Sequence, residues 1–110
     1  MERLHVNFDF LNFDELEVPQ YIYESFLKHS NRKVVITQPR RIAATSLSKR
    51  VAEERNEKLG GKVGYSIRFE DRTSSDTQIH FMTDGMLLRS LLSDPEMRLV
   101  DFVILILQLP

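Results

Sequence analysis

Two short polar clusters in this 110-residue chain have the residue types and the spacing that bind phosphate groups. The first runs from Thr37 to Arg41 and contains two adjacent arginines, and the second runs from Thr83 to Arg89. Guanidinium groups donate charge-assisted, fork-shaped hydrogen bonds to phosphate oxygens. Each cluster also lies where a strand pattern passes into a helix pattern, and the free N–H groups of a helix start favour anions. The chemistry that either cluster could perform is therefore phosphate binding.

Both clusters also have an ordinary structural interpretation. Arg40 and Arg41 can be solvated surface charges, which is the usual environment of an arginine pair. Asp84 can cap the following helix by accepting hydrogen bonds from first-turn amides, without any ligand. The residue types alone leave these alternatives open.

The composition excludes several other kinds of site. The absence of cysteine excludes a disulfide scaffold, a thiolate zinc site and a cysteine nucleophile. His5, His29 and His80 share no metal-ligand spacing, and no serine lies in a nucleophile-elbow pattern, so we expect neither a metal site nor a catalytic residue. The 15 basic and 16 acidic residues give a net charge of -1, so contact with nucleic acid must come from a local cluster.

The chain shows no feature of a membrane or secreted protein. No apolar run approaches the roughly 20 residues that span a bilayer. The first residues, Met1 to Val6, lack the apolar core of a secretory signal. We therefore expect an intracellular protein, nuclear or cytoplasmic, that makes no membrane contact.

Alternating strand and helix patterns must position the two clusters. Lys33–Thr37 is a β-branched run typical of a buried parallel strand, and a helical pattern follows it from Arg40 to about Lys58. Thr77–Met82 alternates as a strand does, and a helix follows from Asp84. The other predicted elements are a helix from Pro19 to about Lys28, strands at Val63–Phe69 and Phe102–Leu107, and a polar loop at Glu70–Asp76. Strands that alternate with helices predict an α/β sandwich with a mostly parallel sheet, whose ligands bind beyond the carboxyl ends of the strands.

Four stretches of the sequence resemble segments of DEAH-box RNA helicases. Thr37–Ala44 resembles motif Ia, Val63–Asp71 resembles the segment that follows it, and Phe81–Arg89 resembles motif Ib. Pro19–Glu24 resembles the helix after the family's phosphate loop, and the similarity keeps the family's order from about Val18 to Leu105. The resemblance implies a truncated RecA-like domain of the P-loop NTPase type, a three-layer sandwich whose sheet would be incomplete.

In that family, motifs Ia and Ib bind the sugar-phosphate backbone of single-stranded RNA. The site residues implied here are Gln38, Arg40, Arg41, Thr83, Asp84 and Gly85. The resemblance implies that Arg40, Arg41 and Thr83 contact phosphate, and that the other three shape the two loops. The expected partner is single-stranded RNA, bound weakly and without sequence preference; the sequence identifies no protein partner.

The sequence departs from the family where ATP and Mg²⁺ would bind. A phosphate loop should precede Pro19, but Phe8–Glu15 contains neither glycine nor lysine, and Asp14 aligns with the family's lysine. The Asp-Glu-Ala-His box should begin after Leu105, where the chain reads Ile-Leu-Gln-Leu-Pro. We therefore expect no cofactor and no ATP hydrolysis in this chain. Two alternatives are an active helicase whose missing motifs come from elsewhere, and a fragment that is non-functional or only binds proteins.

The same departures predict three regions. Residues 1–17 are expected to be a divergent, weakly structured segment. Residues 18–105 are expected to form the partial RecA-like domain, and residues 106–110 a divergent tail.

Overall fold

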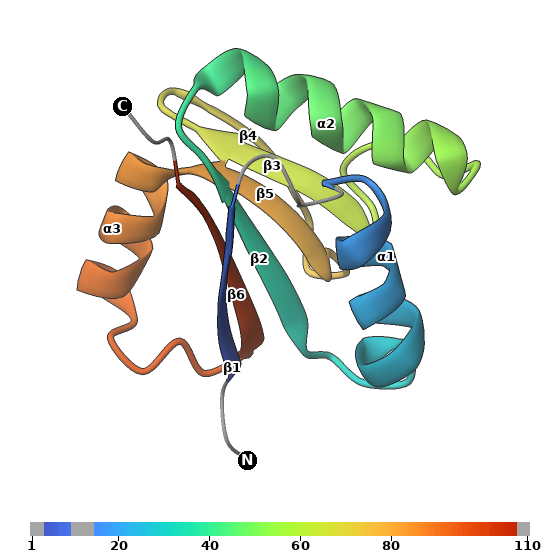
Figure 1. The fold of residues 1–110 in the computed structure, drawn as a ribbon, viewed down its shortest axis with the longest axis horizontal. Coiled ribbons are helices and arrows are strands. Elements are labelled where there is room, and N and C mark those ends of the chain that lie inside the picture. Colours follow the sequence, from blue (N-terminus) through green and yellow to red (C-terminus); the bar gives the residue numbers. More distant parts are fainter. Residues whose placement is uncertain (1–3, 10–14, 108–110) are drawn as a thin grey trace.

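The computed structural model describes residues 4–9 and 15–107, which form an α/β structure of three layers (Figure 1). Its elements, in chain order, are β1 (Leu4–Asp9), α1 (Glu17–Ile22), the π-helical turn η1 (Tyr23–Leu27), β2 (Lys33–Gln38), α2 (Arg41–Glu54), β3 (Val63–Ile67), β4 (Glu70–Arg72), β5 (Ile79–Thr83), α3 (Asp84–Ser93) and β6 (Val100–Leu107). The sheet has the order β1-β6-β2-β5-β3-β4, and only β4 is antiparallel to its neighbour. Helices α1 and α2 cover one face and α3 covers the other (Figure 1). The predicted fold class is confirmed and is consistent with part of a RecA-like domain.

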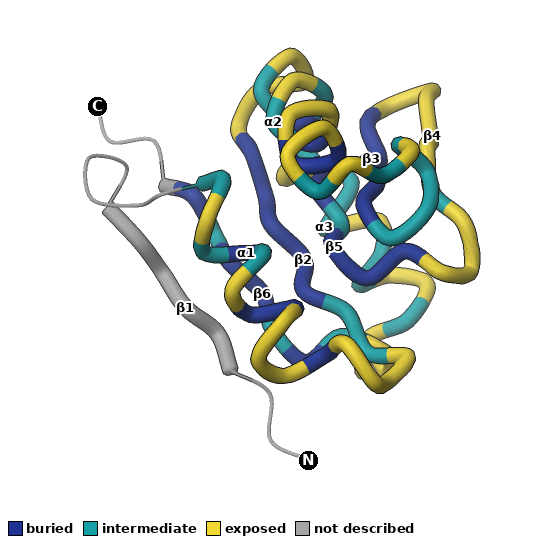
Figure 2. Tube along the Cα trace, turned by 90° about the vertical axis from the view of Figure 1, so that its right-hand side faces the viewer, coloured by how far each residue is buried: buried dark blue, intermediate teal, exposed yellow. Residues whose placement is uncertain are grey.

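The core lies between the sheet and the α1–α2 layer. Leu27, Ile36, Phe81 and Ile104 are fully buried, and the small Ala44 lets α2 approach the strands. Figure 2 shows the buried trace running through β2 and β5 in the middle of the sheet. Because β2 is buried on both faces, its continuous β-branched run is the pattern of an inner parallel strand.

The structure differs from the sequence prediction at Glu70–Asp76 and at the end of α2. Glu70–Arg72 forms strand β4 rather than a loop, because the left-handed backbone of Phe69 (φ 70°) reverses the chain into an antiparallel hairpin with β3. Its three side chains are exposed because β4 is an edge strand, so no apolar alternation marks it. Helix α2 ends at Glu54, not near Lys58, because Asn56 takes a left-handed φ of 54°.

Both regions that were expected to diverge from the family contribute backbone to the sheet. Leu4–Asp9, within the segment expected to be weakly structured, forms β1 and pairs in parallel with β6, with Val6 opposite Ile104. The expected tail from residue 106 begins within β6, where Ile106 is buried in the core. Asp14 and residues 108–110 lie outside the described residues, and the predicted domain boundaries stay a prediction.

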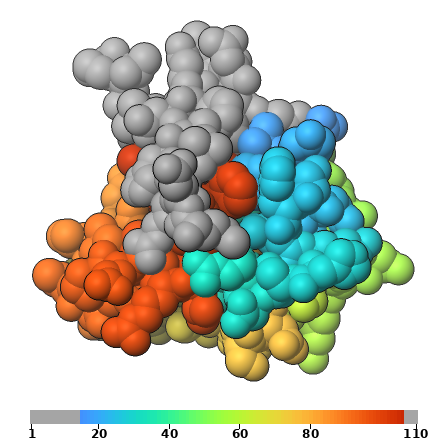
Figure 3. Space-filling model, turned by 90° about the horizontal axis from the view of Figure 1, so that it is seen from below, coloured from blue at the N-terminus to red at the C-terminus, as the bar shows by residue number. Residues whose placement is uncertain are grey.

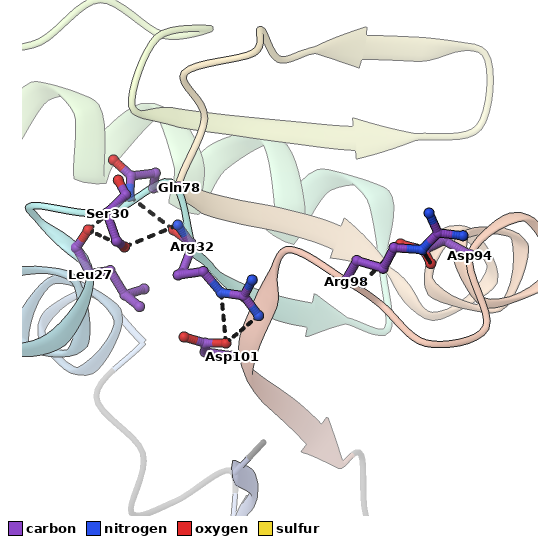
Figure 4. Close-up of polar contacts among 7 residues, drawn as sticks. All are labelled: Leu27, Ser30, Arg32, Gln78, Asp94, Arg98 and Asp101. Atoms are coloured by element: carbon purple, nitrogen blue, oxygen red, sulfur yellow. Dashed lines mark hydrogen bonds and ion pairs between the residues drawn. The ribbon is translucent and has the colours of Figure 1, made fainter. Parts of the chain in front are cut away.

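A network of buried polar groups holds the amino ends of the strands. The side-chain amide of Gln78 donates to the carbonyl oxygens of Leu27, Ser30 and Arg32, each at 2.9 Å (Figure 4). Arg32 in turn donates from Nε and Nη2 to Oδ1 of the buried Asp101, at 2.9 and 2.6 Å. Seen from this edge, the loop before β2 and the segment before β6 lie side by side (Figure 3), joined by the Lys33 N–H, which donates to the Leu99 carbonyl. At the edge opposite the two clusters, the segments that precede β2, β5 and β6 are therefore joined by hydrogen bonds.

Candidate nucleic-acid interface

The sheet brings the two predicted clusters together at its carboxyl edge. Strands β2 and β5 are parallel neighbours, and Gln38 at the end of β2 lies opposite Thr83 at the end of β5. Helix α2 begins at Arg41 and helix α3 at Asp84, so both helices start at this edge, one on each face of the sheet (Figure 1). Segments more than forty residues apart in the sequence are thereby adjacent in space.

The starts of both helices lack a capping side chain. Arg40 and Thr83 occupy the N-cap positions in extended backbone conformations, and neither side chain makes a capping hydrogen bond. The alternative in which Asp84 caps α3 is wrong, because Thr83 takes the cap position and Asp84 is the first helical residue. First-turn N–H groups without a side-chain acceptor attract anions, and the helix dipole acts in the same direction.

The arginine pair lies on the surface beside the β3–β4 hairpin. Arg40 and Arg41 are exposed, and Arg41 Nη2 donates to the carbonyl oxygen of Arg68 at 3.4 Å. The two arginines line an open hollow of about 920 Å³, together with Thr45 and Ser46 of α2 and Ile67 of β3. Its lining combines the two guanidinium-bearing residues with the apolar residues Ile42, Ala43 and Ile67.

The structure adds two residues that the sequence analysis did not select. Phe69, at the hairpin turn, is 89% exposed, and the guanidinium of Arg68 lies over its ring at 4.8 Å. The sequence holds an adjacent Arg and Phe at the end of an alternating strand, which was a usable signal. The contact of Arg68 with Arg41 follows from the sheet, because β3 is parallel to β5 and β2 and therefore ends at the same edge.

Gln38 and its neighbour Thr37 are internal. Thr37 Oγ1 donates to the Ile104 carbonyl at 3.5 Å and accepts from the Ile106 N–H at 3.4 Å, so it ties the end of β2 to β6. Gln38 is 2% exposed, and its Nε2 has no hydrogen-bond partner among the residues that the structure describes. In this arrangement Gln38 does not reach a ligand at the surface, and its expected part in shaping the loop stays a prediction.

The second cluster is more open than the first. Thr83 is half-buried, and Asp84 and Gly85 are exposed. A Cβ atom built on Gly85 would meet nothing within 4 Å. The backbone here therefore has room for a ligand, and no close approach of protein atoms requires glycine at residue 85.

A serine, a histidine and an aspartate meet elsewhere on the sheet without forming a catalytic arrangement. Ser66 Oγ lies 2.7 Å from His80 Nε2, but Asp71 accepts from Ser66 at 3.4 Å rather than from the imidazole. Burial lowers the pKa of His80 to about 4, and the charge of Lys33 acts in the same direction. A base this weak is a poor activator of a hydroxyl at neutral pH.

The described residues show neither a metal-binding cluster nor a membrane-spanning helix. Within residues 4–9 and 15–107, no group of three or more His, Cys, Asp or Glu side chains could hold a metal ion. No helix of that same part of the chain is long and apolar enough to cross a membrane.

Comparison with known proteins finds relatives with one activity in their names. The chain is 51% identical to the mouse ATP-dependent RNA helicase DHX33 over 89 residues. These residues make up 81% of this chain and 13% of that protein. It is 49% identical over 88 residues to the pre-mRNA-splicing factor ATP-dependent RNA helicase DEAH10 of Arabidopsis thaliana, covering 80% of this chain and 12% of the relative. It is 51% identical over 79 residues to a probable ATP-dependent RNA helicase, the DHX35 homolog of Caenorhabditis elegans, covering 72% and 11%. No protein-family model matches the chain.

Proposed function

We propose that this chain binds the backbone of single-stranded RNA. The premise is that the chain belongs, over most of its length, to the DEAH-box family of ATP-dependent RNA helicases. The observation that carries the proposal is the pairing of Gln38 with Thr83, which puts both phosphate-type clusters at one edge of the sheet. Arg40, Arg41 and Thr83 contact phosphate oxygens in this proposal, assisted by the uncapped N–H groups of α2 and α3.

The binding is weak and has no sequence preference. Contacts to phosphate and sugar carry no information about the bases. The net charge of -1 gives no long-range attraction, so affinity depends on the local arginines. Phe69 follows Arg68, whose carbonyl contacts Arg41, and its exposed ring can stack on an unpaired base, which tolerates every base.

The proposal does not include ATP hydrolysis by this chain. The sequence before Pro19 lacks the glycines and the lysine that hold a triphosphate, and the residues after Leu105 supply no acid for Mg²⁺. We therefore propose no bound cofactor, although ATP and Mg²⁺ serve the family. An active helicase would require those motifs from elsewhere.

Titration of a labelled oligouridylate with the 110-residue chain, followed by fluorescence anisotropy, tests the proposal. Each phosphate neutralised on a single strand contributes about -0.7 to the slope of log K against log salt, so Arg40 and Arg41 together contribute about -1.4. The double variant Arg40→Ala, Arg41→Ala is expected to lose binding and to keep its circular dichroism spectrum, because both side chains are exposed.

The control is Lys58→Ala, Arg98→Ala, which removes the same charge from two exposed residues away from the carboxyl edge, one of which, Arg98, has its Nε 3.6 Å from Asp94. This control is expected to bind RNA as the parent chain does. Equal losses in both double variants would contradict the site. A chain that unfolds cooperatively but binds no RNA at low salt would favour a protein-binding or non-functional fragment instead.

A further inference from the structure

A row of polar side chains continues from the interface along the solvent side of α2. Arg41, Thr45 and Lys49 are spaced i, i+4, i+8, so they follow one another on the same side of the helix. At 1.5 Å per residue, the row extends for about 12 Å from the start of the helix. The side of α2 that packs on the core is formed by other residues, namely Ala44, Ser48, Val51 and Ala52.

The hollow beside the arginine pair opens onto this row. Thr45 lines the hollow together with Arg41, and Ser46 lines it with an exposed hydroxyl. Thr45 Oγ1 donates to the Ile42 carbonyl at 3.0 Å, so its hydroxyl proton is used within the helix and the next positive charge along the row is that of Lys49. Lys49 lies one helical turn beyond Thr45, outside the lining of the hollow.

Lys49 is the uncompensated positive charge on this path. Its side chain is exposed, and no carboxylate of the described structure forms an ion pair with it, including Glu53 one turn further along. The neighbouring Arg50 differs, because its Nε lies 3.8 Å from Glu54. Lys49 is thus available to a phosphate, whereas the charge of Arg50 is partly satisfied within the helix.

We infer that Lys49 binds an additional phosphate of the RNA strand, so that the strand runs from the start of α2 along its solvent side. This inference rests on the proposed function. It extends the binding surface beyond the two clusters, to a residue that neither cluster contains. The flexible ammonium acts as a point charge that follows the phosphate rather than fixing its orientation.

The anisotropy titration in a series of salt concentrations tests the inference with Lys49→Ala and Lys58→Ala. Both variants lose one exposed positive charge, but Lys58 follows the end of α2 and lies off the row. For the parent chain the expected slope is about -2.1, from three phosphates. Lys49→Ala is expected to reduce the slope to about -1.4 and to weaken binding about eightfold at 50 mM salt. Lys58→Ala is expected to keep both the slope and the affinity of the parent chain.

The possible results separate this inference from the proposed function. If Arg40→Ala, Arg41→Ala abolishes binding while Lys49→Ala and Lys58→Ala behave alike, Lys49 holds no phosphate and the proposed function stands. If the parent chain binds no RNA, both fail. A specific loss in Lys49→Ala, with an unchanged circular dichroism spectrum, supports the extended path.

Discussion

At the scale of single residues, Gln78 and His80 each make polar contacts inside the fold. The two N–H groups of the Gln78 amide are shared among three carbonyl oxygens, and the Nε2 of the half-buried His80 lies 2.7 Å from Ser66 Oγ. Neither residue lies at the carboxyl edge where the candidate interface is located. Their substitution therefore tests the fold independently of the proposed function.

The imidazole of His80 makes stability depend on pH. Burial holds its folded pKa near 4, whereas an unfolded histidine titrates near 6.5. Between these values the unfolded chain binds more protons, so the free energy of unfolding falls as the pH is lowered from about 6.5 to about 4. The expected slope from this residue is up to about 1.4 kcal/mol per pH unit.

Urea denaturation at a series of pH values measures this effect. In His80→Gln the part of the slope due to His80 is expected to disappear, and the exposed His29 gives a matched variant, His29→Gln, that keeps it. A parent slope that persists in His80→Gln would show that other groups cause the loss of stability in acid.

Replacement of Gln78 is expected to destabilise the chain strongly. In Gln78→Ala the carbonyl groups of Ser30 and Arg32 lose this donor, whereas that of Leu27 keeps the hydrogen bonds from Ser30, and an unsatisfied buried group costs roughly 1–3 kcal/mol. Gln78→Glu is expected to cost at least as much, because a carboxylate oxygen then faces carbonyl oxygens, although Lys62 lies 3.1 Å from the other oxygen. Chemical denaturation measures both, and a Gln78→Glu chain as stable as the parent would contradict this account of the network.

At the scale of elements, the ends of helices and strands decide where ligands can bind. The parallel register of β2 and β5 places two strand ends and two helix starts together. The β3–β4 hairpin then folds its turn back toward α2. Gly64 in β3 is crowded by neighbouring backbone atoms, whereas Gly85 in α3 has open space around it. The two residues therefore give a matched pair of alanine substitutions.

Gly64→Ala is expected to displace β4, and Gly85→Ala is expected to stabilise α3. A Cβ on Gly64 would lie 2.4 Å from the backbone oxygen of Arg72, which cannot move without breaking the hairpin. A Cβ on Gly85 meets open space in the first turn of a helix, where alanine is favoured by up to about 1 kcal/mol.

Thermal unfolding compares the two alanine variants, and a gain in stability for Gly64→Ala would contradict the hairpin geometry. The anisotropy titration adds a test of the predicted role of Gly85. Because no protein atom lies near its Cβ position, Gly85→Ala is expected to bind RNA as the parent does. A loss of binding with intact stability would instead show that the RNA backbone itself approaches this residue closely.

At the scale of the whole molecule, the chain spans 11–13% of the length of the relatives compared here. The helicase activity named for those proteins therefore belongs to chains several times longer than this one. The part it shares with them contains the clusters proposed to bind RNA, whereas the sequence offers no glycine-rich loop for a nucleotide.

We expect no measurable binding of ATP, with or without Mg²⁺. Asp14, in the position of the family's lysine, would repel the triphosphate, and no glycines are present there to let backbone N–H groups approach it. Isothermal titration calorimetry of the chain with ATP measures this directly. Saturable binding in the micromolar range would overturn the expectation and favour the alternative of a nucleotide-dependent enzyme.

The sequence by itself determined the alternation of strands and helices, the fold class and the positions of the two polar clusters at the ends of strands. These features are local, because β-branched runs such as Lys33–Gln38 and the polar residues that end them are read over a few positions. The family resemblance was legible for the same reason, since its motifs are short continuous segments such as Thr37–Ala44.

Only the tertiary structure decided which of these residues meet and which reach the surface. The register of β2 with β5 joins the two clusters. The parallel strand β3 brings Arg68 to the same edge, where its carbonyl contacts Arg41, and Gln38 is buried at the end of β2. Strand β4 arises the same way, since its polar residues pair only because the turn presents them to β3. Strand pairing and burial join residues distant along the chain, so no local pattern of residue types contains them.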